Sequence, residues 1–167
     1  MKILMLADSL GLGGVETHIE LLQRKLSEMG CVVVVGSSGG EIAKRMIKNK
    51  ENHILLPSFD SKIDKNTPPF LDVLIAQRAL YRAVRKLRPD LVHAHTRKTA
   101  FLAYFICRHE SIPLVVSAHA KLSMSNIIKL LTVWGDGTIA VCEDIKSHIK
   151  ENSIIKPRLI TVIRNGV

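Results

Sequence analysis

Short apolar runs alternate with longer stretches of helical periodicity along the whole chain. Residues 2–9 are almost continuously apolar, which is typical of a strand covered on both faces of a sheet. From Val15 onward, apolar residues recur every three or four positions until Gly30, a residue type that often ends a helix. The alternation continues to the last residues and predicts about seven strands and about six helices.

The other predicted strands cover residues 31–35, 53–56, 91–95, 114–118, 137–142 and 159–163. The other predicted helices cover residues 40–48, 70–87, 98–108, 123–131 and 144–151. Strands joined by helical crossovers run parallel, and the right-handed crossover rule winds them into one open sheet. We therefore expect an α/β fold with a doubly wound, mostly parallel Rossmann-like sheet and helices on both faces.

Length and composition favour a single domain over residues 1–167. With 167 residues and 47% hydrophobic content, the chain can bury one sizeable core. Residues 57–69 form the only linker-like stretch, which we interpret as a loop. No apolar run approaches the ~18 residues of a membrane span, and no signal-peptide pattern follows the first strand. The three cysteines, Cys31, Cys107 and Cys142, are interpreted as buried thiols in a reducing cytosol, so we expect a cytoplasmic protein.

A glycine-rich turn follows the first predicted strand and reads Gly11-Leu12-Gly13-Gly14-Val15-Glu16. Such a turn brings backbone N–H groups and a helix N-terminus close to a ligand. A dinucleotide-binding loop would need a third glycine where Glu16 stands, and its carboxylate would repel a pyrophosphate. The sequence therefore argues against a dehydrogenase, although the glycines could also serve only to make a tight turn.

Five segments together resemble the N-terminal domain of the family-4 retaining glycosyltransferases, which have the GT-B fold. They are Gly13-Gly14-Val15-Glu16, Asp90-Leu91-Val92-His93-Ala94-His95, Val115-Val116-Ser117-Ala118-His119, Ile139-Ala140-Val141-Cys142 and Val162-Ile163-Arg164-Asn165-Gly166-Val167. The resemblance implies that this domain holds the acceptor, and that a C-terminal domain absent from this chain holds the nucleotide-sugar donor. It implies no cofactor for this domain alone.

The resemblance also implies roles for single residues. His119 matches the acceptor-side histidine of the cleft, and Glu16 matches the acidic residue that opens the first helix, so both are catalytic candidates. Gly13 and Gly14 match the loop that lets phosphate approach the backbone. In the loop after the fourth predicted strand, we assign acceptor or phosphate binding to His95, Arg97 and Lys98.

His93 and His95 lie two positions apart on a strand and therefore point to the same side. A metal site would need a third ligand that the sequence does not indicate, so we predict no metal. The sequence instead favours His95 as a residue of the cleft and His93 as a packed, hydrogen-bonded residue.

The net charge of +9 would attract phosphate-bearing partners. Arg78, Arg82 and Arg85 form a basic stripe on the predicted helix 70–87, whose apolar strip is expected at Val73, Leu80, Val84 and Leu87. Such a helix could bind an anionic membrane surface at the inner face of the membrane, or could simply be a solvated face. No aromatic residues interleave with the basic ones, so we expect no nucleic-acid partner.

The sequence thus predicts the acceptor-binding domain of a retaining, metal-independent glycosyltransferase that acts on a lipid-linked, polysaccharide or other glycan acceptor in cell-envelope polysaccharide biosynthesis. Two alternatives stay open at this point. One is another sugar-nucleotide enzyme of similar fold, such as an inverting transferase or an epimerase. The other is a non-catalytic module that binds carbohydrate or phosphate.

Overall fold

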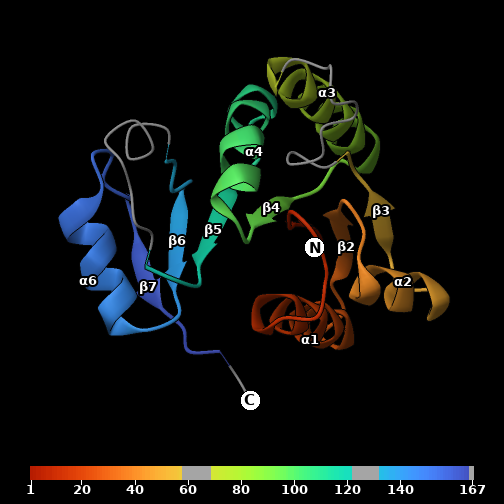
Figure 1. Cartoon of the computed structure of the whole chain (residues 1–167), viewed down its shortest axis with the longest axis horizontal. Helices are drawn as coiled ribbons and strands as arrows, with labels where there is room; N and C mark the ends of the chain where they lie inside the picture. The colour runs from red at the N-terminus through yellow and green to blue at the C-terminus, as the bar shows by residue number, and fades with distance from the viewer. Residues whose placement is uncertain (58–68, 122–131, 166–167) are drawn as a thin grey trace.

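A computed structural model describes residues 1–57, 69–121 and 132–165 and shows one sheet with helices on both sides (Figure 1). The strands are β1 (Lys2–Leu6), β2 (Val32–Ser37), β3 (His53–Leu55), β4 (Leu91–Ala94), β5 (Leu114–Ala118), β6 (Gly137–Ala140) and β7 (Ile160–Val162). The helices are α1 (Gly14–Glu28), α2 (Glu41–Lys48), α3 (Pro69–Leu87), α4 (Arg97–Glu110) and α6 (Glu143–Asn152). The predicted helix 123–131 and most of the linker-like stretch 57–69 lie outside the described residues.

All neighbouring strands pair in parallel, in the order β3-β2-β1-β4-β5-β6-β7. The predicted doubly wound α/β sheet is therefore confirmed. The chain runs outward from β1 to β3 and then returns to place β4 on the other side of β1. Loops that follow β1 and β4 leave the sheet toward opposite faces, and this switch point opens a crevice at the carboxyl ends of the strands.

Successive side chains of a strand point to opposite faces of the sheet, so the strands contribute to two separate apolar cores. In β1, Leu4 and Leu6 pack with the residues of α3, α4 and α6, whereas Ile3 and Met5 pack with α1 and α2. Figure 1 shows α1 and α2 below the sheet, and α3 and α4 above it. Every strand residue of β1 after Lys2 is buried, which is why this run reads as continuously apolar.

On the face where α1 packs, the described helices cover only part of the sheet. Among the described helices, α1 and α2 pack near β1, β2 and β3, while α6 belongs to the core on the opposite face. Beside α1, an apolar pocket of about 290 Å³ is lined by Leu22 and Leu26 of the helix and by strand residues that include Val115 and Ile139. On this face, none of the described helices covers the β5–β6 side of the sheet.

Three sequence predictions about burial are wrong. On α3 the buried positions are Asp72, Ala76, Leu80 and Val84, whereas Val73 is exposed, because burial on this helix repeats every four residues. Cys31 and Cys142 are free but only half-buried, since each lies just outside a strand. Cys107 is buried and free as predicted, and burial, with a smaller contribution from Asp136, raises its pKa to about 12.

None of the described helices combines the length and the apolar character that a membrane crossing requires.

Candidate functional site

The candidate site lies at the switch point, where hydrogen bonds join the loops that follow β1 and β4. The backbone N–H of His95 donates to the carbonyl oxygen of Leu6 at 2.9 Å, which continues the pairing of β4 with β1. The Thr96 hydroxyl donates to Asp8 Oδ1 at 3.1 Å. Thr96 also caps α4, because its Oγ1 accepts from the backbone N–H of Thr99. These contacts hold the start of α4 against the β1 loop.

The glycine-rich loop lies on the other side of this crevice. Gly13 is the N-cap of α1, and Gly13 and Gly14 line a shallow pocket of about 490 Å³ together with His18. Glu16 does not line this pocket. Its carboxylate folds back over Gly13, where an added Cβ would lie 2.3 Å from Oε2. In the first turn of α1, its charge stabilises the positive end of the helix dipole.

Three histidines, in β4 or just after β4 and β5, point to the face that carries α1. His93 and His95 lie two positions apart, as predicted, with ring centroids 4.1 Å from each other. His93 Nε2 lies 2.8 Å from the Ser117 hydroxyl of β5, so His93 is packed and hydrogen-bonded. His119 follows β5, and its Nε2 lies 3.2 Å from His95 Nδ1.

A fourth histidine, His18, reaches the same cluster from α1. Its ring centroid lies 5.3 Å from that of His119 and 6.1 Å from that of His95. Sequence reasoning missed this residue. His18 lies three positions after Val15 and four before Leu22, so a polar residue on the apolar stripe of the first helix was the signal that could have found it.

The cluster carries little positive charge at neutral pH. Burial, with smaller contributions from the charges of His119 and His18, lowers the pKa of His93 to about 4. Burial and the charge of His18 lower the pKa of His119 to about 4. Burial lowers the pKa of His95 well below its ordinary value and also lowers that of His18. The four imidazoles are therefore neutral near pH 7 and offer both N–H donors and nitrogen lone pairs.

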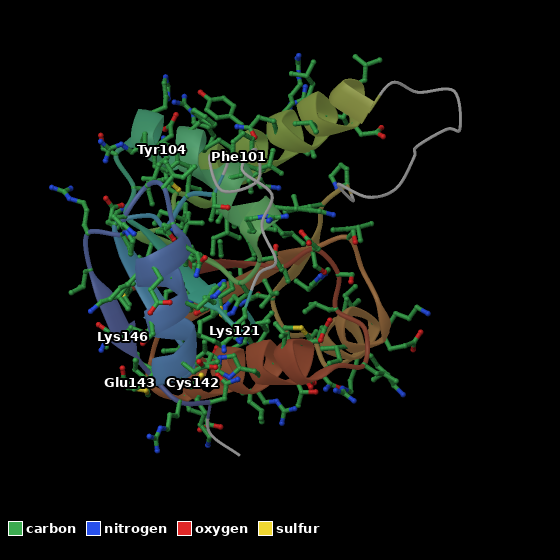
Figure 2. The ribbon with its side chains drawn as sticks, turned by 60° about the vertical axis from the view of Figure 1, so that its left-hand side comes forward. Phe101, Tyr104, Lys121, Cys142, Glu143 and Lys146 are labelled. Carbon is green, nitrogen blue, oxygen red and sulfur yellow. The ribbon has the colours of Figure 1, made fainter. Side chains whose placement is uncertain are left out.

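A pocket of about 190 Å³ opens beside these rings at the carboxyl ends of β4 and β5. Its lining includes His95, Arg97, His119 and Trp134. Lys98 is exposed on the first turn of α4 and does not line this pocket. Beyond His119, Lys121 Nζ pairs with Asp144 Oδ2 at 2.7 Å. Figure 2 shows Lys121 beside the start of α6, where Cys142 and Glu143 lie.

The structure thus gathers His95, Arg97 and His119 into one pocket and places Gly13 and Gly14 in a neighbouring pocket. His18 borders the glycine pocket and contacts the His119 ring, so it connects the two. Arg78, Arg82 and Arg85 are not part of this site. They are exposed on α3, which packs on the opposite face of the sheet from α1. The arrangement can donate hydrogen bonds to oxygen atoms and can place one arginine near an anion.

Comparisons with known proteins agree with the fold. The sequence model of Glycosyltransferase Family 4 matches residues 12–167. A glycosyltransferase structure from Rickettsia africae ESF-5 has a TM-score of 0.78 and 23% identity, and the match covers 99% of this chain and 43% of that chain. HepE from Anabaena, in complex with UDP-glucose, has a TM-score of 0.76 and 20% identity over 100% of this chain and 44% of that chain.

A third structure is WaaB, a lipopolysaccharide outer core galactosyltransferase. Its TM-score is 0.76 at 16% identity, over 100% of this chain and 46% of that chain. No curated protein sequence matches the chain significantly. The chain spans less than half the length of each of these structures. Because the family model extends over nearly the whole chain and the sheet has the same architecture, the chain belongs to glycosyltransferase family 4 and has the fold of the N-terminal domain of a GT-B enzyme.

Proposed function

We propose that this chain is the acceptor-side domain of a retaining glycosyltransferase that moves a sugar from a nucleotide-sugar donor to a glycan or lipid-linked acceptor. The observation that carries the proposal is the position of His119. It lies at the carboxyl edge of β5, and His18 connects it to the pocket of the Gly13-Gly14 loop. In an open α/β sheet, ligands bind outside this edge at the switch point.

The chemistry of His119 fits hydrogen bonding better than proton donation. Its pKa of about 4 leaves it neutral at pH 7, so the ring donates one N–H without carrying a charge. A donor fixed in a pocket stabilises an oxygen on which charge develops during transfer. The backbone N–H groups at the start of α1 and the Arg97 side chain supply further attraction for phosphate or acceptor oxygens. The transfer as proposed needs no metal ion.

The donor is proposed to bind to a second domain that faces this edge. HepE, which this chain resembles over its whole length, was solved with UDP-glucose, and that structure is more than twice as long as this chain. A continuation of the chain, or a separate protein, would supply the donor half. Glu16, whose carboxylate folds over Gly13, would then position the glycine loop instead of contacting the reacting atoms.

We further propose a place for the enzyme at the cytoplasmic surface of a membrane, where cell-envelope glycans are assembled. Support comes from α3, where the exposed apolar residues Leu71, Leu74 and Ile75 are followed by the exposed Arg78, Arg82 and Arg85. Apolar and basic residues on one exposed helix face favour binding to an anionic bilayer.

His119→Ala in the protein that carries both domains tests the proposal. Loss of a fixed hydrogen-bond donor at the reacting centre should lower turnover by ~10²-fold or more. The melting temperature should stay close to that of the parent, because His119 lies at a pocket edge and not in an apolar core. His109→Ala, which removes an exposed histidine on α4, is the matched control and should leave turnover unchanged. Near-normal turnover in a folded His119→Ala enzyme would remove His119 from the mechanism.

A further inference from the structure

We propose that His18, His95 and His119 form a binding site for a divalent transition-metal ion, with Zn²⁺ as the best fit. Each of the three residues offers one ring nitrogen, and these three nitrogens lie within 4.8 Å of one another. The residues come from α1, from the end of β4 and from the end of β5, so the fold itself assembles them. The sequence suggested a different pair, His93 and His95, and did not indicate which residue would be a third ligand.

The separation of two of these nitrogens already suits a shared ion. His95 Nδ1 and His119 Nε2 are 3.2 Å apart. Two imidazole nitrogens at 2.0–2.1 Å from a tetrahedral zinc ion lie about 3.3 Å from each other. His18 is half-buried and offers the third nitrogen, which lies within 4.8 Å of the other two.

An ion bound by His95 Nδ1 and His119 Nε2 would replace the hydrogen bond between these two atoms, and the proton of each neutral ring would then lie on its other nitrogen. These other nitrogens, His95 Nε2 and His119 Nδ1, are buried and have no hydrogen-bond partner among the described residues, so no neighbouring donor prevents either ring from taking up this tautomer. His95 itself is only 3% exposed.

His93 is not one of the three residues whose nitrogens lie close together, and its Nε2 is bonded to the Ser117 hydroxyl. It packs against the ring of His95 and fixes the orientation of that ligand. Three neutral imidazoles suit zinc, copper or nickel, whereas Mg²⁺ and Ca²⁺ prefer oxygen ligands. Three protein ligands leave a fourth position for water or another oxygen ligand.

An ion held here would occupy His119 and withdraw it from the hydrogen bond proposed above. The site is therefore inferred as a point of inhibition by metal and not as part of the transfer step. Metal binding by the chain does not depend on the proposed function, so the two ideas fail separately.

The test measures Zn²⁺ binding to the purified, chelator-treated chain by titration calorimetry. The background carries Cys31→Ser and Cys142→Ser, since half-buried thiols also bind zinc. We expect one ion per chain with micromolar or tighter affinity and no heat with Mg²⁺. His18→Ala and His119→Ala should each weaken binding by at least ~10-fold, because loss even of an outer-shell partner has an effect of that size. His109→Ala, at an exposed histidine, should change nothing.

Circular dichroism and thermal melting of each variant establish that it is folded. His18 and His119 are only half-buried, so these two substitutions keep the test valid if His95→Ala fails to fold. Absence of saturable Zn²⁺ binding would overturn the inference. Binding of unchanged stoichiometry and affinity in both His18→Ala and His119→Ala would overturn it as well, since the ion would then lie on other histidines.

Discussion

At the residue scale, Gly40 shows how one backbone conformation shapes the candidate site. Its φ is 122°, a region that residues with a side chain rarely adopt, and an added Cβ would lie 2.2 Å from the carbonyl oxygen of Leu10. That oxygen accepts a hydrogen bond from Ile42 at 2.9 Å, and Leu10 donates to Gly39 at 2.7 Å. Gly40 therefore lets the loops that follow β1 and β2 lie against each other.

Gly40→Ala should lower the free energy of unfolding by ~2 kcal/mol or more, since it combines backbone strain with a clash against a fixed carbonyl. Urea denaturation measures the change. Gly11→Ala, in the neighbouring loop that follows β1, is the matched control, because no atom lies within 4 Å of the added Cβ. It should shift the free energy by no more than ~0.5 kcal/mol. Equal destabilisation by both substitutions would contradict this account of Gly40.

Single residues differed in how well the sequence predicted their positions. His95, Arg97 and His119 were expected at the carboxyl ends of strands, and they lie there because strand ends in a parallel sheet share one edge. His18 was missed because helical periodicity assigns a residue on the apolar stripe to the core and does not say which strand it meets. The roles assigned to these residues stay predictions.

At the element scale, α3 carries the prediction on membrane binding. Vesicle sedimentation should show stronger binding to anionic than to neutral vesicles, and raised salt should weaken it, since each basic residue near the surface contributes ~1 kcal/mol. Arg82→Glu should reduce binding to anionic vesicles. Lys48→Glu, an equal charge change at the end of α2, is the control and should have a smaller effect. Equal binding to both vesicle types would show that the stripe is merely solvated.

Element types were predictable, but their ends and their order in the sheet were less so. β1 was expected to continue to residue 9 yet ends at Leu6, because Ala7 and Asp8 already form the loop that bonds to Gly36 and Ser38. Apolarity alone cannot mark this point, since Ala7 and Leu10 are as buried as the strand itself. The alternation of strands and helices predicts parallel pairing. The position of β4 beside β1, however, depends on how α1 and α2 pack on one face of the sheet and α3 and α4 on the other.

At the scale of the whole molecule, the buried neutral histidines make folding sensitive to acid. In the folded chain the pKa of His93 and of His119 is about 4, against 6.5 for an ordinary histidine. Between these values the unfolded chain binds more protons, so the contribution of these two histidines to stability is fully present above pH 6.5, falls as the pH is lowered toward 4, and does not change further below that. For the buried His93 the loss approaches about 1.4 kcal/mol per pH unit, and for the half-buried His119 it is smaller because solvent screens its charge.

Urea denaturation across this pH range, with a chelator present to exclude metal, checks the prediction. The groups that face His93 are the rings of His95, His119 and His18 and the hydroxyl of Ser117. No described carboxylate shifts the pKa of His93. His93→Gln should therefore flatten the pH dependence, whereas the exposed His109→Ala should leave it unchanged. A stability that does not change between pH 7 and pH 4.5 would contradict the burial of neutral histidines.

The position of β1 between β2 and β4 has a consequence for the chain as it leaves the ribosome. β2 pairs with β1 almost at once, but the other edge of β1 stays open until Leu91–Ala94 has been synthesised, more than fifty residues after Ser37. At ~5–20 residues per second, this edge is unpaired for roughly 3 to 11 seconds. Its residues, Ile3 to Leu6, are wholly apolar, and open apolar edges attract other strands. The nascent chain should therefore depend most on chaperones during this interval, and slower translation of the segment before β4 should raise the fraction that aggregates.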